Sequence, residues 1–152
     1  MKEDSFFLTY DVLEKAVENA KSMVKSLEKK GDFKKGEFGV YIIITKKKRF
    51  SFLNSNFQYE SFKKADLAFR EKKDVVDIVN KTPSRLVKGD IVWLGGIYSQ
   101  ELKIAIGVDG LDSEEINDKV ARYLLKQIET ICIIEAKQEI KKLKARGAVF
   151  LS

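Results

Sequence analysis

An apolar repeat near the C-terminal end constrains the fold of this chain more than any other feature. Seven small or apolar residues recur there at every fourth position: Ile116, Val120, Leu124, Ile128, Cys132, Ala136 and Ile140. An α-helix has about 3.6 residues per turn, so this stripe drifts slowly around the helix. The pattern predicts a helix from near Asp112 to about Lys144, unusually long for a chain of 152 residues. We therefore expect residues 1–152 to form one domain, with a helical extension over about 129–152.

The residues before this helix predict a helix, a hairpin, a helical segment and a second hairpin. Thr9 can cap the first helix and Gly31 can stop it. Runs of β-branched and aromatic residues are typical of strands, and polar turns separate them. The expected ranges are 8–31 for the first helix, 38–45 and 49–54 for the first hairpin, 59–79 for the helical segment, and 91–99 and 102–110 for the second hairpin. This order predicts an α+β fold.

The composition excludes several classes of chemistry. The chain has no histidine and one cysteine, which excludes histidine-ligated zinc, imidazole-ligated haem and the usual serine or cysteine triads. Cys132 lies in the apolar stripe, so we interpret it as a buried small residue rather than a nucleophile. A lone cysteine is consistent with a reducing compartment, and residues 40–44, the longest apolar run, are far short of a membrane span. We therefore expect a cytoplasmic protein without a membrane partner, and a binding domain rather than an enzyme.

Basic residues leave an anionic partner open. The formal charge is +6, and the richest clusters are Lys46–Arg49 and Lys137–Arg146. With phenylalanines nearby, the first cluster resembles a platform for nucleic-acid bases and phosphates. The simpler interpretations are a solvated hairpin turn above core phenylalanines and a favourable interaction with the dipole at the end of a helix. Weak nucleic-acid binding stays an alternative, but we do not expect it.

The segment 104–115, IAIGVDGLDSEE, joins a strand to the last helix through two glycines and several carboxylates. Carboxylates repel phosphate, and their spacing does not match a calcium-binding loop. We expect Asp112 to cap the helix, with Glu115 three residues later completing a capping box.

A family resemblance rests on four stretches: FLTYDVLEKAVENAKSMVKSL, FGVYIIIT, REKKDVVDIVNKTPSRL and GGIYSQELKIAIGVDGLDSEEINDKVARYLL. They resemble the GlcG/HbpS-like family of haem-degrading and haem-binding domains. The resemblance implies a profilin-like fold, in which helices flank a central antiparallel sheet, and it implies homo-oligomers. It also implies haem as a possible cofactor, although the chain lacks a histidine ligand. Cysteine, methionine or tyrosine can replace histidine in principle, but Cys132 and Met23 both fall on apolar helix faces.

The resemblance also implies a ligand pocket. Its residues would be Lys72, Thr82, Gly95, Gly96 and Tyr98. There Lys72 would recognise an anionic group, and the glycines would allow close approach of a small anionic ligand. The alternative is that Lys72 is a solvated helix residue and that the glycines only form a bulge in an edge strand.

The function expected from these patterns is binding or assembly without catalysis. The last helix carries apolar residues beyond the part that one small domain can cover: Ile131, Ile133, Ile134, Ile140 and Leu143. We therefore expect a homo-oligomer that forms through this helix. Haem or tetrapyrrole binding or degradation is the alternative that the family resemblance implies.

Overall fold

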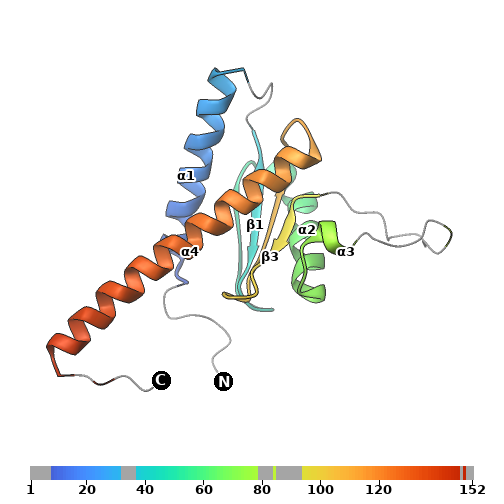
Figure 1. Ribbon diagram of the computed structural model, residues 1–152. Coiled ribbons are helices and arrows are strands. Elements are labelled where there is room, and N and C mark those ends of the chain that lie inside the picture. The colour runs from blue at the N-terminus through green and yellow to red at the C-terminus, as the bar shows by residue number, and fades with distance from the viewer. Residues whose placement is uncertain (1–7, 32–36, 79–83, 85–93, 148, 150–152) are drawn as a thin grey trace.

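The chain folds into a four-stranded antiparallel sheet with helices on both faces, as Figure 1 shows. The computed structural model describes residues 8–31, 37–78, 84, 94–147 and 149. The elements in chain order are α1 (Tyr10–Lys29), β1 (Gly39–Ile43), β2 (Arg49–Leu53), the short 3-10 helix η1 (Ser55–Phe57), α2 (Gln58–Glu71), α3 (Val75–Ile78), β3 (Gly96–Tyr98), β4 (Ala105–Asp109) and α4 (Glu114–Ala145). This arrangement confirms the predicted α+β class, the flanked central sheet and the long C-terminal helix.

Each face of the sheet is covered by a different layer of helices. The strands lie in the order β2-β1-β4-β3, and Ile42 of β1 pairs with Phe50 on one side and Ile106 on the other. Alternate residues point to opposite faces of a strand. Val40, Ile42, Ile106 and their neighbours therefore share one face, where they pack with α1 and α4 in the main core. The opposite face carries Ala105 and Tyr98, which pack with Ala68 of α2 and Val75 of α3.

Both ends of α1 follow the sequence signals. The hydroxyl oxygen of Thr9 accepts a hydrogen bond from the Val12 amide at 3.3 Å, and Thr9 precedes the first helical residue. At the other end, Gly31 adopts a φ of +83° and its amide donates to the carbonyl of Glu28. A left-handed glycine after the last turn is a common helix stop. The predicted start and end of this helix are confirmed.

The first hairpin is also confirmed. β1 and β2 pair antiparallel around the turn that contains Lys46 and Lys47. Phe50 and Phe52 point to the α1 side and pack against the core, where the Tyr10 ring stacks on Phe52 and meets Phe50 edge-on, both at 5.5 Å between centroids. These two phenylalanines are therefore half-buried side chains that pack against the core.

Helix α4 starts one residue later than expected. Ser113, and not Asp112, is its N-cap: the Ser113 hydroxyl accepts from the Ile116 amide at 3.2 Å. Both residue types cap helices well, so the local pattern alone could not separate them. The helix runs to Ala145, close to the predicted end.

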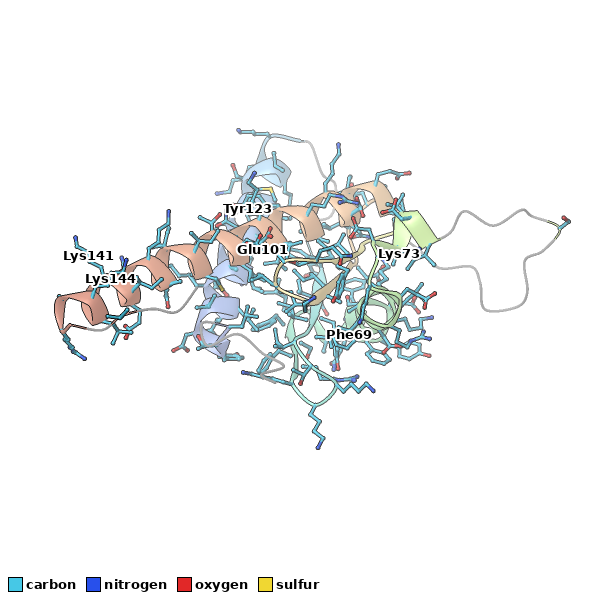
Figure 2. The ribbon with its side chains drawn as sticks, turned by 60° about the horizontal axis from the view of Figure 1, so that its bottom comes forward. Phe69, Lys73, Glu101, Tyr123, Lys141 and Lys144 are labelled. Atoms are coloured by element: carbon cyan, nitrogen blue, oxygen red, sulfur yellow. The ribbon has the colours of Figure 1, made fainter. Side chains whose placement is uncertain are left out.

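The second half of α4 leaves the body of the protein. Figure 1 shows it extending past α1 and the sheet, and we call residues 133–145 the overhang. In Figure 2 the side chains of Lys141 and Lys144 project from it with no other element beside them. By contrast, the first half packs Val120, Leu124 and Ile128 into the main core.

Helix α2 lies unusually close to the sheet because two strand positions are glycines. A Cβ atom at Gly107 would overlap the carbonyl oxygen of Ser61, and one at Gly96 would lie 2.5 Å from the carbonyl oxygen of Lys64. Backbone atoms cannot move aside as the end of a flexible side chain can. These glycines therefore set the distance between the helix and the sheet.

This packing predicts the effect of adding one methyl group. The substitution Gly107→Ala should lower the free energy of unfolding by about 1–3 kcal/mol, the usual cost of overpacking a core, and urea titration would measure it. Ser51→Ala in the exposed part of β2 is the control and should change stability little. Equal stabilities of the two variants would contradict the close packing of α2 on β4.

Candidate functional site

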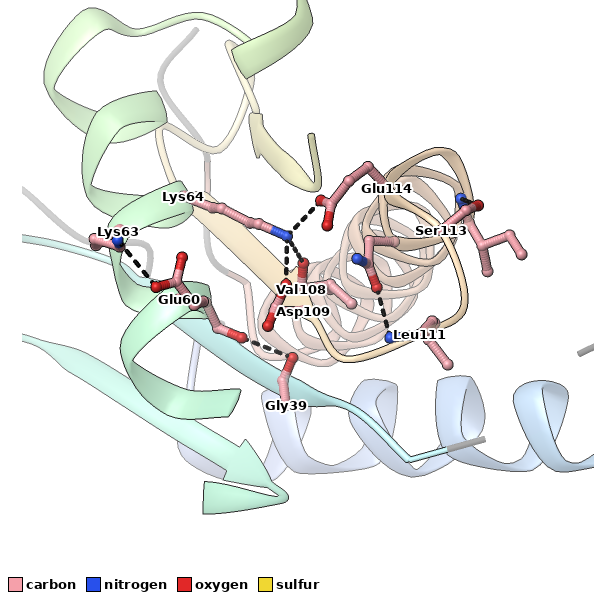
Figure 3. A network of polar contacts seen from close by, with 12 residues as sticks. Gly39, Glu60, Lys63, Lys64, Val108, Asp109, Leu111, Ser113 and Glu114 are labelled. Atoms are coloured by element: carbon pink, nitrogen blue, oxygen red, sulfur yellow. Dashed lines mark hydrogen bonds and ion pairs between the residues drawn. The ribbon is translucent and has the colours of Figure 1, made fainter. Parts of the chain in front are cut away.

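The most buried charge in the described chain is the ammonium group of Lys64. This α2 side chain is only 2 % exposed. Its Nζ donates to the Val108 carbonyl at 3.0 Å, to Asp109 Oδ1 at 2.8 Å and to Glu114 Oε2 at 2.9 Å (Figure 3). An ammonium group has three protons, so all three are used. Lys64 thus joins α2, the end of β4 and the first turn of α4 at one point.

The sequence reasoning missed Lys64. Its neighbours Ser61, Ala65 and Ala68 are all buried, and they indicate the face of α2 that meets the sheet. A lysine on such a face needs a partner, because burial of an unpaired charge is very costly. The carboxylates in 104–115 supply that partner, so Asp109 and Glu114 are engaged inside the fold.

Removal of this cation should destabilise the protein strongly. Lys64→Met would leave a carbonyl and two carboxylates without their donor. We expect a loss of about 3 kcal/mol, the lower end for breaking a buried ion pair, since both carboxylates keep some exposure. Thermal and urea unfolding would measure it.

Lys63 provides the matched control, because it is exposed and its partners, Glu60 and the Tyr59 ring, lie on its own helix. Lys63→Met should change stability by less than about 1 kcal/mol. If the two variants were equally stable, the Lys64 contacts would not hold the three elements together.

The sequence-predicted pocket residues fall into two groups. Gly95 and Gly96 lie against the packed side of α2: a Cβ at Gly95 would come within 3.3 Å of Lys64 Nζ, and one at Gly96 would meet Val75. Lys72 and Tyr98 lie farther along the same side of the sheet. Thr82 lies outside the described residues. Ligand binding by these five residues stays a prediction.

Lys72 ends α2 in a left-handed conformation, with a φ of 55°. Its side chain is exposed, and its carbonyl accepts from Gln100 Nε2 at 2.7 Å. Tyr98 is buried on β3: its ring meets Phe69 edge-on, and its amide donates to Asp74 Oδ1 at 2.8 Å. Burial raises the pKa of the Tyr98 phenol.

A depression of about 350 Å³ lies beside these two residues, lined by Lys73, Asp74, Asp77, Tyr98 and Gln100. Asp74 accepts hydrogen bonds on both carboxylate oxygens: Oδ2 accepts from Arg122 Nη1 at 2.9 Å, and Oδ1 accepts from the Tyr98 amide. Arg122 in turn donates to Asp118 at 2.7 Å. The lining carries both signs of charge, so it would suit a small polar molecule better than a simple anion.

Of the two possible sulfur ligands for haem, one is buried and the other is half-buried. Cys132 is buried and Met23 packs against the main core. Among the residues that the structure describes, no three acidic or cysteine side chains are grouped to hold a metal ion. The haem alternative stays a prediction, as does nucleic-acid binding through Lys46–Arg49 and Lys137–Arg146.

The environment of Cys132 predicts its reactivity. Burial, and then the negative charge of Glu135, raises the pKa of its thiol to about 11. An unfolded cysteine ionises near pH 8.5, and only the thiolate is a good nucleophile. Alkylation at pH 8 should therefore be slow in the folded protein and fast in urea.

The same shift links stability to pH. The unfolded chain loses the Cys132 proton at a lower pH than the folded chain does, so the free energy of unfolding should fall as the pH rises from about 8.5 towards 11.

Mass spectrometry of the alkylated protein measures the rate at which Cys132 is alkylated with and without urea. Equal rates at pH 8 with and without urea would contradict the buried position.

The overhang of α4 carries three exposed isoleucines. Ile133, Ile134 and Ile140 are 45 %, 50 % and 38 % exposed. Between and beside them lie Lys137, Lys141, Lys142 and Lys144, all exposed. No helix in the described residues has the length and apolar content needed to cross a bilayer.

Comparison with known proteins found no matching family model, no matching curated protein and no matching solved structure.

Proposed function

We propose that this chain is a non-catalytic assembly domain that pairs with a second copy of itself through the α4 overhang. The observation that carries the proposal is the exposure of several isoleucines on a helix that extends past its own core. A helical segment as short as the overhang is only marginally stable in water when nothing packs against it. Burial of its apolar side chains against another molecule would stabilise it. A lone cysteine favours a reducing compartment, so we expect this assembly in the cytoplasm.

The spacing of the apolar residues fits a two-stranded coiled coil. Ile133, Ala136, Ile140 and Leu143 follow one another at intervals of three, four and three residues, the spacing of a heptad seam. In a parallel coiled coil, isoleucine at the first seam position with leucine at the second favours two strands. Here Ile133 and Ile140 take the first position, and Ala136 and Leu143 take the second.

The charged residues beside the seam favour the parallel orientation as well. In a parallel pair, Glu139 of each helix lies beside Lys144 of the other, which gives two ion pairs related by symmetry. In the antiparallel pair that joins Ile133 to Leu143, the two copies of Glu139 approach each other, and so do the two copies of Lys137. Like charges at such positions destabilise the pair.

The seam lies on another face of α4 than the residues that pack into the core. Those core residues are Val120, Ala121, Leu124, Ile128, Ile131 and Cys132. At about 100° per residue, their face is turned by about a third of a turn from the seam of the overhang. Two bodies would therefore lie to the sides of a parallel helix pair.

The charge pattern gives a test that distinguishes the orientations. Lys144→Glu should weaken the dimer because it places Glu139 beside a second carboxylate. The double variant Glu139→Lys with Lys144→Glu should restore it, since the ion pairs are exchanged. Sedimentation velocity over a concentration series would measure both.

Ile133→Ser with Ile140→Ser should give a monomer with an unchanged core, and circular dichroism would check the fold. A wild-type protein that stays monomeric up to about 1 mM, where association is worth only about 4 kcal/mol, would refute the assembly proposal. A dimer that Lys144→Glu leaves unchanged would contradict the parallel orientation.

A further inference from the structure

Strand β2 is an edge of the sheet in the described part of the chain, where it pairs with β1 alone. The Ile44 amide donates to the Lys48 carbonyl at 2.9 Å, and the Asn54 amide donates to the Phe38 carbonyl at 3.1 Å. In an antiparallel ladder, every second residue pair exchanges hydrogen bonds. Between these two ends, Phe50 and Phe52 are therefore the residues of β2 that bond β1.

The remaining backbone groups of β2 point away from the sheet. These belong to Arg49 and Ser51, which alternate with the bonded residues, whereas Leu53 ends the strand in a left-handed conformation with a φ of 66°. They offer donors and acceptors at the spacing that an added strand requires. An open edge of this kind is a template for pairing with another extended segment.

A cavity lies next to this edge on the α2 side of the sheet. Its volume is about 460 Å³, and its lining consists of Tyr41, Ser55, Gln58, Tyr59 and Phe62. Tyr41 pairs across the strands with Ser51, whose small side chain is exposed. The Tyr41 and Phe62 rings meet edge-on at 5.2 Å, while Tyr59 is 67 % exposed. The exposed Tyr59 ring beside this cavity offers a surface against which an apolar side chain of a partner can pack.

The other side of the edge is aromatic as well. Phe50 and Phe52 lie there with Tyr10, which is itself 46 % exposed. Side chains of an added strand point alternately to the two faces. Apolar residues at alternate positions would therefore meet the cavity, and the residues between them would pass the Tyr10 cluster.

The charge at the start of β2 selects the partner. Lys46, Lys47 and Arg49 are all exposed at the hairpin turn. The segment 46–54 of this chain, KKKRFSFLN, contains no carboxylate. Pairing of two β2 strands would leave these cations unmatched, whereas an acidic segment would neutralise them.

We propose that β2 binds an extended acidic segment of a partner protein, which adds to the sheet as a further strand. Backbone groups of Arg49 and Ser51 provide the hydrogen bonds. The cavity beside Tyr41 and Tyr59 takes one apolar side chain, and the basic turn takes flanking carboxylates. This surface is separate from the α4 overhang, so the two proposals stand or fall independently.

The probe is a short labelled peptide with alternating valine and threonine, a central leucine and glutamates at both ends. Fluorescence anisotropy should detect binding to the full chain, and NMR should show amide shifts centred on 49–53. The same peptide with lysines in place of glutamates should bind at least tenfold more weakly. Added salt should weaken the binding of the acidic peptide more than that of the basic peptide.

Ser51→Pro tests the edge itself. Proline removes the outward amide of Ser51 but no bond to β1, and edge strands tolerate proline on that side. It should weaken binding about tenfold, the upper cost of one lost hydrogen bond. Ser51→Ala keeps the amide and should bind normally. Tyr59→Ala, at an exposed position, should also weaken binding without loss of stability.

The peptide provides a second test that does not depend on a folded variant. N-methylation of the alternate residues that face β2 should abolish binding, while N-methylation of the residues between them should not. Equal effects of the two patterns, or no binding of the acidic peptide, would overturn the proposal. Equal binding of acidic and basic peptides would also do so. A wild-type dimer that Ser51→Pro dissociates would assign this edge to a second copy instead.

Discussion

The shared cation at Lys64 is the interaction on which the rest of the structure depends. It joins the Val108 carbonyl and two carboxylates from different elements, Asp109 and Glu114. Charge-assisted hydrogen bonds of this kind are stronger than neutral ones. They can form only because Gly96 and Gly107 let α2 approach the sheet closely. The close packing and the buried cation therefore require each other.

Much of the fold could be predicted from local patterns. The start and end of α1, the β1–β2 hairpin and the length of α4 follow from caps, turn residues and periodicity, all of which act over a few residues. The cap of α4 shows the limit of such reasoning. Asp112 and Ser113 are both good caps, and the choice depends on how the chain leaves β4.

The candidate site depends on contacts between distant parts of the chain, so the sequence predicted less of it. Gly95 and Gly96 were recognised as unusual positions, but the local pattern did not indicate their neighbours: a Cβ at Gly96 would meet the Lys64 carbonyl of α2, and one at Gly95 the Val108 carbonyl of β4. The burial of Lys64 was hard to predict from local sequence, because lysine is rarely buried and its carboxylate partners lie 45 and 50 positions away. The depression beside Tyr98 likewise forms only when residues 73–77 meet the end of β3.

The first turn of helix α4 is held by the body of the protein, whereas its last turns project from it. Its first turn is bound to Lys64 through Glu114, and one uninterrupted helix of about 48 Å carries that orientation to Ala145. An insertion or deletion of one residue between Ile131 and Ile133 would turn everything beyond it by about 100°. The junction between the packed and projecting halves should therefore accept substitutions far more readily than changes in length.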